Sequence, residues 1–123
     1  MYMNQRATGI IIKDNKILLL HRIKNGREYY VFPGGGVEDG ETAEEAMIRE
    51  IKEEVSLDAE IDKFLFQIFN LNREEKYFLI TNFTGEVKLG GPEAEMMNEN
   101  DQYHPMWIDI SEIEKMEMLL PKE

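Results

Sequence analysis

The chain contains no cysteine and has only two histidines, His21 and His104, among its 123 residues. The absence of cysteine excludes a disulfide framework, which is compatible with a reducing compartment. Neither histidine has sequence neighbours that suggest a zinc site or a nucleophile pair, so we expect structural roles for both. The N-terminus lacks the basic-then-apolar organisation of a signal peptide. We therefore expect a cytoplasmic protein.

Long hydrophobic runs and basic residues are also scarce. The run Ile17-Leu18-Leu19-Leu20 is far shorter than the roughly 20 residues of a membrane-spanning helix. There are 14 Lys and Arg residues against 25 Asp and Glu, which gives a net charge of −11. This balance argues against binding to duplex nucleic acid or to an anionic membrane. An anionic substrate would have to be attracted by a metal ion or by local basic side chains.

The length and composition predict one domain. A chain of 123 residues, 42% of them hydrophobic, can bury a single core but is too short for two ordinary domains. The sequence shows no internal repeat, low-complexity tract or linker. We therefore expect residues 1–123 to fold as one unit.

A capping motif marks the start of one helix. The hydroxyl of Thr42 can accept from the amide of Glu45, and the Glu45 carboxylate can reach back to the amide of Thr42. We expect the helix to begin at about Ala43. Its periodicity turns one set of apolar residues toward the core, namely Met47, Ile48, Ile51 and Val55.

Three carboxylates fall on one edge of this apolar face, those of Glu50, Glu53 and Glu54. Like charges three and four residues apart repel one another, and more strongly where a helix packs against a sheet. A divalent cation would neutralise them, and oxygen ligands in a partly open site suit magnesium or manganese. Taken alone, the helix fits equally well a solvated surface helix with ion pairs such as Glu45–Arg49.

The segment before the helix favours the metal site. Between Phe32 and Glu41 it contains one proline and four glycines, namely Pro33, Gly34, Gly35, Gly36 and Gly40. A backbone without side chains can approach a metal ion and a phosphate closely. Because this glycine-rich loop directly precedes the helix, a metal site becomes a stronger interpretation than a solvated surface helix.

The stretch from Gly35 to Leu57 resembles the Nudix box. In that family pattern a glycine is followed, at fixed spacing, by Glu, Arg-Glu, an aliphatic residue, Glu-Glu, glycine and an aliphatic residue. The matching residues here are Gly35, Glu41, Arg49, Glu50, Ile51, Glu53, Glu54 and Leu57. Only Ser56 departs, because the family has glycine there. A residue just past a helix often adopts a left-handed conformation, which would strain Ser56.

The resemblance implies a reaction, the hydrolysis of a nucleoside diphosphate linked to another moiety by attack of water at phosphorus. Glu50, Glu53 and Glu54 would hold one or more magnesium or manganese ions, and the carbonyl of Gly34 would complete the metal shell. Either Glu53 or Glu50 would act as the base. Arg49 would hold the neighbouring carboxylates in register.

Family members often add a carboxylate from a later loop. Our candidate for this ligand or base is Glu93, which follows the Gly90-Gly91-Pro92 break. Its close rivals are Glu95, Glu99 and Asp101.

Markers that follow the box in some Nudix groups are absent here. Where ADP-ribose hydrolases and dinucleoside polyphosphate hydrolases carry theirs, this chain has Asn72-Arg73-Glu74, and Tyr77 is out of frame. By elimination we favour a nucleoside triphosphate pyrophosphohydrolase, with oxidised nucleotides among its candidate substrates. The alternatives are an inactive Nudix-like module that senses a nucleotide or binds a protein, and an acidic protein that buffers divalent ions. The complete Arg49-Glu50 and Glu53-Glu54 set argues against both.

Alternating apolar runs predict the remaining elements. We expect a β-hairpin from residues 8–12 and 16–21 around Asp14-Asn15. Further strands are expected at residues 29–32, 59–69, 76–83 and 102–110. The aromatic residues of these strands could stack a nucleotide base but are more often core, and they are Tyr29, Tyr30, Tyr103 and Trp107. This order resembles the Nudix fold, an α+β fold in which helices sandwich a mixed β-sheet (α/β/α).

The C-terminal part resembles the family least. Family members usually end in a helix that covers the second face of the sheet, whereas residues 111–118 offer one short amphipathic segment. We therefore expect the C-terminal helix to be short or absent. Either the sequence stops short of that helix or another subunit covers the face. An exposed apolar face is rare on a soluble monomer, so we expect a homodimer.

Overall fold

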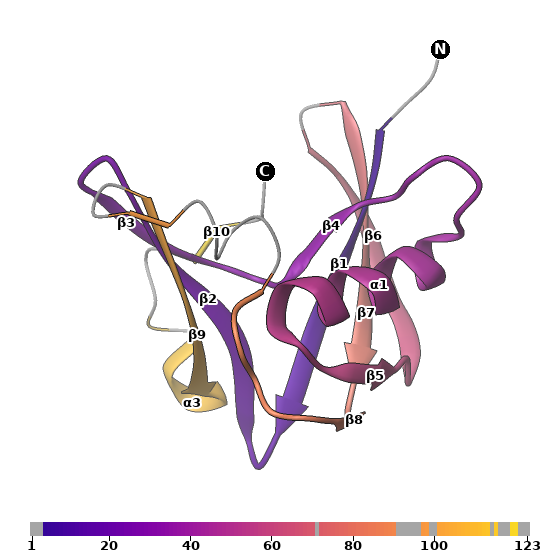
Figure 1. The fold of residues 1–123 in the computed structure, drawn as a ribbon. Coiled ribbons are helices and arrows are strands. Elements are labelled where there is room, and N and C mark those ends of the chain that lie inside the picture. Colours follow the sequence, from indigo (N-terminus) through magenta and orange to yellow (C-terminus); the bar gives the residue numbers. More distant parts are fainter. Residues whose placement is uncertain are drawn as a thin grey trace.

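The chain opens with a long hairpin whose strands pair only near their turn. In the computed structural model, which describes residues 4–70, 72–90, 97–98, 101–113, 115 and 119–120, β1 (Asn4–Lys13) and β2 (Lys16–Lys24) are joined by Asp14 and Asn15. Both turn residues have positive φ, at 52° and 61°, which Asp and Asn tolerate in tight hairpin turns. The paired residues are Ile12 with Ile17 and Lys13 with Lys16, and the strands then diverge (Figure 1). The predicted hairpin is confirmed, with longer strands.

This divergence divides the main sheet into two halves. On the β1 side, β7 (Arg73–Ile80) runs parallel to β1, and β6 (Lys63–Asn70) runs antiparallel to β7. On the β2 side, β2 lies between β3 (Arg27–Val31) and β9 (Asp101–Asp109), and β10 (Leu119–Leu120) is parallel to β3. Parallel and antiparallel pairs occur together, which confirms the predicted mixed sheet.

The short strand β4 (Gly34–Gly36) connects the two halves. It follows β3 in the chain but pairs antiparallel with β1, so the backbone crosses between the halves at Pro33. The amide of Gly9 donates to the carbonyl of Pro33, and the amide of Val37 donates to the carbonyl of Gln5, both at 2.9 Å. These bonds fix the start of the glycine-rich loop against β1.

The helix α1 (Ala43–Val55) lies over β1 and β4 (Figure 1). It begins at the predicted residue, and the predicted capping box is present, with bonds of 3.1 Å to the Thr42 hydroxyl and 2.9 Å to the Glu45 carboxylate. The predicted core face needs one correction, since Ile48 is 43% exposed and Ala46 is buried in its place. The face is rotated because the helix also turns a carboxylate, that of Glu54, toward β4.

Two predicted strands are each divided. The predicted strand at 59–69 becomes β5 (Asp58–Glu60) and β6, and the one at 76–83 becomes β7 and β8 (Asn82–Thr84). The short strands β5 and β8 pair with each other in a separate two-stranded sheet. Each predicted strand is interrupted because its short part pairs in this separate sheet. Between β5 and β6, the amide of Asp62 donates to the carbonyl of Leu79 at 2.8 Å.

The C-terminal helix is short, as predicted. The helix α3 (Ile110–Ile113) spans four residues after β9. In the part of the chain that the structure describes, α1 is the only longer helix, and none could span a membrane. Of the predicted segment at residues 111–118, residues 114 and 116–118 lie outside the described residues.

Ser56 closes α1 in the left-handed conformation, with φ 65° and ψ 26°, which confirms the prediction for this position. Its amide donates to the carbonyl of Lys52 at 3.1 Å, and its hydroxyl donates to the carbonyl of Lys88 at 2.8 Å. The side chain therefore strains the helix end but also ties it to the segment after β8.

We expect Ser56→Gly to change the melting temperature by only about 2 °C, because ~1 kcal/mol of relieved strain is offset by ~1 kcal/mol of lost hydrogen bond. Ser56→Ala keeps the strain and loses the bond, so it should lower the melting temperature by about 4 °C. Thermal unfolding followed by circular dichroism measures both. An alanine variant that melts at the wild-type temperature would show that the hydroxyl contributes nothing.

Candidate active site

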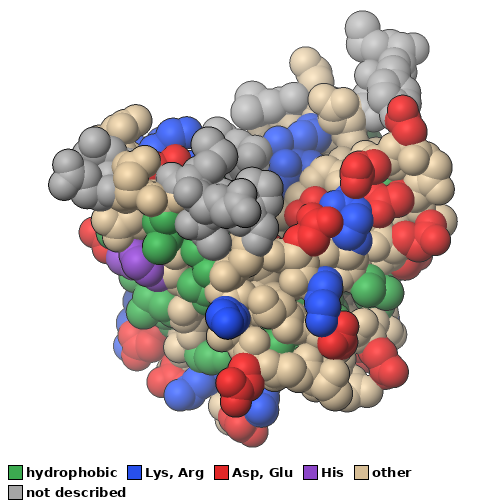
Figure 2. Space-filling model, viewed as in Figure 1, with side chains coloured by type: hydrophobic (Ala, Val, Ile, Leu, Met, Phe, Trp, Pro, Cys, Tyr) green, Lys and Arg blue, Asp and Glu red, His purple; other side chains and the backbone are tan. Residues whose placement is uncertain are grey.

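The guanidinium of Arg49 lies at the centre of the site and joins the loop to the helix. Its Nε and Nη2 donate to the two oxygens of Glu41, at 2.7 and 2.9 Å, and Nη2 also donates to the carbonyl of Gly36 at 3.0 Å. Its Nη1 donates to Glu50 at 2.9 Å and to Glu53 at 3.4 Å. Figure 2 shows acidic side chains gathered around a basic one over α1 and the preceding loop. These contacts fit the predicted role of holding the carboxylates in register.

Two positions of β4 require glycine, because atoms of β1 approach one of them closely and atoms of α1 approach the other. A Cβ at Gly34 would overlap the carbonyl oxygen of Ala7 on β1. A Cβ at Gly35 would overlap the carboxylate of Glu50 on α1. Any side chain at these two positions would therefore displace either the backbone of β1 or a predicted metal ligand.

Glu54 is the buried member of the carboxylate set. It is 1% exposed, and its Oε1 accepts from the amide of Gly34 at 3.0 Å. Gly34 therefore lies next to Glu54. The bond seen here uses the amide of Gly34, and metal ligation by the Gly34 carbonyl stays a prediction. Glu53 lies at the rim, with its side chain 52% exposed.

The three predicted ligands share one side of α1 without forming a closed cage. Among the residues that the structure describes, no three His, Cys, Asp or Glu side chains have the arrangement of a metal centre. Glu50 and Glu53 are turned toward Arg49, and Glu54 toward Gly34. Magnesium keeps several waters and rarely takes an all-protein shell, so an open set of oxygen ligands that includes one buried carboxylate fits it.

The pairing with Arg49 also fixes the charge of Glu41. Hydrogen bonds from Arg49, followed by the backbone bond at Glu38, lower the pKa of Glu41 to about 2. The same carboxylate, together with Glu50, raises the pKa of Arg49 above its ordinary value. Both groups therefore stay charged at neutral pH.

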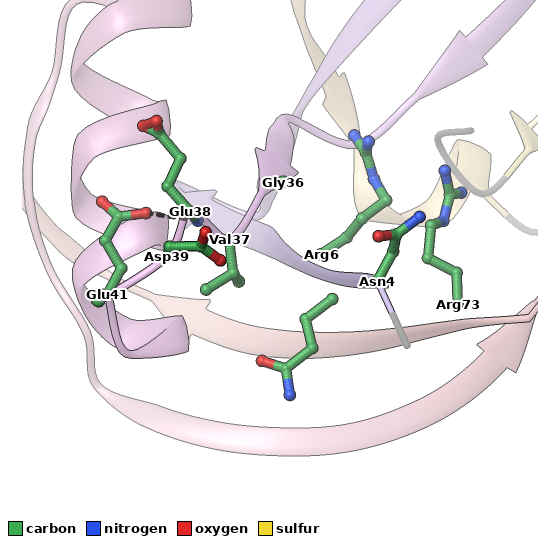
Figure 3. A pocket seen from close by; sticks show the side chains of 10 residues that line it. Asn4, Arg6, Gly36, Val37, Glu38, Asp39, Glu41 and Arg73 are labelled. Atoms are coloured by element: carbon green, nitrogen blue, oxygen red, sulfur yellow. Dashed lines mark hydrogen bonds between the residues drawn. The ribbon is translucent and has the colours of Figure 1, made fainter. Parts of the chain in front are cut away.

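A cavity of about 410 Å³ opens beside the loop. Figure 3 shows the acidic side chains of Glu38, Asp39 and Glu41 on one side of it and those of Arg6 and Arg73 on the other. The acidic side belongs to the loop that leads into α1, and the basic side belongs to β1 and β7. The cavity therefore lies between the loop that leads into α1 and a pair of cations, and the predicted metal ligands Glu50, Glu53 and Glu54 are not among its lining residues.

Comparisons with known proteins agree with this geometry. A family model described as the NUDIX domain matches residues 3–122. The chain belongs to the Nudix family. An ADP-ribose pyrophosphatase from Methanocaldococcus jannaschii is 40% identical over 102 residues, which cover 76% of this chain and 60% of that relative. An RNA pyrophosphohydrolase from Psychromonas ingrahamii is 46% identical over 57 residues, which cover 46% of this chain and 32% of that relative. The chain thus spans only part of the length of these relatives.

Solved Nudix structures share the fold. A MutT NUDIX hydrolase from Burkholderia pseudomallei superposes with a TM-score of 0.74 at 22% identity, covering 90% of this chain and 86% of that one. MutT from a study of Aliivibrio salmonicida and Vibrio cholerae gives a TM-score of 0.73 at 24% identity, covering 92% and 85%. These likenesses confirm the predicted α+β fold, a mixed sheet with few helices.

The basic side of this Nudix site, formed by Arg6 and Arg73, was not predicted from the sequence. One signal was available, since Arg73, Glu75 and Tyr77 recur at every second position, which is the spacing of residues on one face of a strand. Charged residues at inward positions of a strand are unusual unless they are paired.

The predicted additional ligand of the Nudix site, Glu93, lies outside the described residues, as do Glu95 and Glu99. Asp101 is described, and it accepts from Nη2 of Arg22 on β2 at 3.1 Å. Whether a later loop supplies a carboxylate stays a prediction.

The histidines and the aromatic candidates make contacts within the sheet and with the core. His21 lies opposite His104 in the β2–β9 register, contacts Glu28 and stacks on Tyr30 with ring centroids 4.6 Å apart. The other three aromatic candidates pack against the core, namely Tyr29, Tyr103 and Trp107.

Acid should remove the contribution of Glu41 to stability. Because its pKa is about 2 in the fold, below the ordinary 4.5, its charged form stabilises the fold fully above 4.5. That contribution is lost as the pH falls from there through 2. We expect Glu41→Gln to be less stable than wild type at about pH 7, with a difference that shrinks toward about pH 3.

Urea unfolding of both proteins across this range measures the difference. Glu44→Gln is the matched control, because Glu44 is an exposed carboxylate in the first turn of α1, three residues after Glu41. A loss of stability in Glu41→Gln that stays constant with pH would contradict the lowered pKa of Glu41.

Proposed function

We propose that this chain is a magnesium-dependent Nudix hydrolase that cleaves the pyrophosphate linkage of a nucleoside diphosphate derivative. The supporting observation is the contact set of Arg49, which holds Glu41, Glu50 and Glu53 together beside a cavity. The pyrophosphatase names of the relatives agree with this reaction class. A module that only senses a nucleotide would not need the complete carboxylate set.

In the proposed reaction, water attacks phosphorus and the bond from that phosphorus to the bridging oxygen breaks. Glu50, Glu53 and Glu54 would hold the metal, which when bound neutralises developing charge and lowers the pKa of water. Glu53, the most exposed of the three, accepts the proton of the attacking water, with Glu50 as the alternative base. Arg49 positions both carboxylates and does not touch the substrate.

Within this class we propose a nucleoside triphosphate as substrate, with oxidised nucleotides among the candidates. ADP-ribose is the second candidate, because the relative at 40% identity is named an ADP-ribose pyrophosphatase. Incubation with nucleoside triphosphates, ADP-ribose, nucleotide sugars and dinucleoside polyphosphates, with magnesium or with EDTA, tests both activity and substrate class. We also propose a cytoplasmic location, with which the lack of cysteine is compatible, and fractionation of the source cells would test it.

We expect hydrolysis to require magnesium or manganese. Glu53→Gln and Glu54→Gln should each lower turnover by a factor of ~100 or more, because an amide is a poor metal ligand and no base. Steady-state rates on the best substrate of the panel measure this, with circular dichroism to check the fold. Glu44→Gln, which lies on the solvent side of the same helix, should retain the wild-type rate. Near wild-type rates for both site variants would remove the site from this helix.

We also propose that the chain forms a homodimer. The edge strand β6 exposes three large apolar side chains, those of Phe64, Phe66 and Phe69, each by 45% or more. Exposed aromatic residues on a strand that ends the sheet of the described residues favour contact with a second copy. Light scattering that returned the 14.4 kDa of one chain at micromolar concentration would contradict this proposal.

A further inference from the structure

Two arginines from neighbouring strands line the cavity on its sheet side. β1 and β7 run parallel with Asn4 opposite Arg73 and Arg6 opposite Glu75. Because side chains alternate between the two faces of a strand, Arg6, Arg73 and Glu75 lie on the same face. Figure 3 shows the guanidinium groups of Arg6 and Arg73, here called the arginine pair, extending in the same direction.

Glu75 holds one member of the arginine pair in place. It is fully buried, and its Oε2 accepts from Nη2 of Arg73 at 3.0 Å and from Nδ2 of the Asn70 side chain at 3.2 Å. Its Oε1 accepts from the hydroxyl of Tyr77 at 3.3 Å. A buried carboxylate needs such partners, so Glu75 is matched by the single positive charge of Arg73.

Arg6 adds a second positive charge to this group. Its Nε is buried and has no hydrogen-bond partner among the described residues. Burial and the charge of Arg73 lower the pKa of Arg6, whereas Glu75, Glu50 and Glu54 raise it. Arg6 therefore lies within electrostatic reach of both the buried Glu75 and the carboxylates of α1.

Two of the acidic side chains across the cavity are engaged by Arg49. Glu41 binds Arg49 through both oxygens, and Glu38 lies 3.4 Å from the same guanidinium. On the sheet side of the cavity two guanidinium groups accompany one carboxylate, and the other carboxylates that act on Arg6, Glu50 and Glu54, are the proposed metal ligands of α1. Guanidinium groups bind phosphate oxygens in pairs with defined geometry.

We propose that Arg6 and Arg73 form a phosphate-binding subsite, in which the polyphosphate chain of the substrate lies between the arginine pair and the glycine-rich loop. The proposal rests on the proposed function and names the residues that draw a phosphorylated substrate onto an acidic protein. The cavity of about 410 Å³ has room for a chain of phosphate groups. Glu75 is a positioning residue that fixes the guanidinium of Arg73.

Binding of inorganic tripolyphosphate in EDTA, measured by calorimetry, tests the subsite without metal or turnover. Arg6→Gln and Arg73→Gln should each weaken binding by ~10-fold, because each removes a charge-assisted contact. Arg22→Gln is the matched control, since Arg22 is similarly buried and ion-paired but lies outside the cavity. Equal affinities for all four proteins, or equal losses in all three variants, would overturn the proposal.

The variant Arg73→Gln leaves Glu75 buried without its cation and could fail to fold. The double variant Arg73→Gln with Glu75→Gln restores a neutral pair at the same positions. It should fold and still bind tripolyphosphate ~10-fold more weakly than wild type. Wild-type affinity in the folded double variant would overturn the role of Arg73.

Kinetics separate this proposal from the proposed function. On the best nucleoside triphosphate, Arg6→Gln should raise KM by ~10-fold and change kcat less than ~3-fold, with Arg6→Lys in part restoring KM. An unchanged KM in an active enzyme would overturn the subsite and leave the proposed function standing. A wild-type protein that hydrolyses no compound of the panel would overturn the proposed function, while the tripolyphosphate comparison still decides the subsite.

Discussion

The helix α1 lies so close to β4 that the carboxylate of Glu50 occupies the space where a side chain at position 35 would begin. On the other side of β4, Gly34 lies equally close to the backbone of β1. The helix therefore packs against β4, and β4 pairs with β1, with no side chain at positions 34 and 35 between them. This close approach brings carboxylates of the helix to backbone amides of the loop, as in the bond from Gly34 to Glu54.

A second constraint is charge. The loop and α1 place several carboxylates in a small volume of a protein that is already strongly acidic. Arg49 neutralises part of this set through ion pairs with four carboxylates, and a divalent ion in the proposed site would neutralise more. Across the cavity, Arg6 and Arg73 have the opposite sign. We infer that a phosphorylated substrate is held between metal and guanidinium groups while the remaining acidic surface repels anions.

Features that depend on contacts between sequence neighbours could be predicted from the sequence, whereas features that depend on the pairing of distant strands could not. The start of α1 was predictable because Thr42 and Glu45 form their capping bonds within one turn. The left-handed conformation of Ser56 followed from its place at the helix end. In contrast, the arginine pair depends on the parallel register of β1 and β7, and the break before β6 depends on the pairing of β5 with β8. Neither register follows from spacing along the chain.

The most direct test of the close approach is the affinity for Mn²⁺ of Gly35→Ala, measured by electron paramagnetic resonance. The added Cβ should displace the Glu50 carboxylate and weaken Mn²⁺ binding by ~10-fold or more, with the fold retained in circular dichroism. Gly36→Ala is the control, because a Cβ there meets no atom within 4 Å and should leave the affinity unchanged. Equal, wild-type affinity in both variants would show that Glu50 and β4 do not form the metal site.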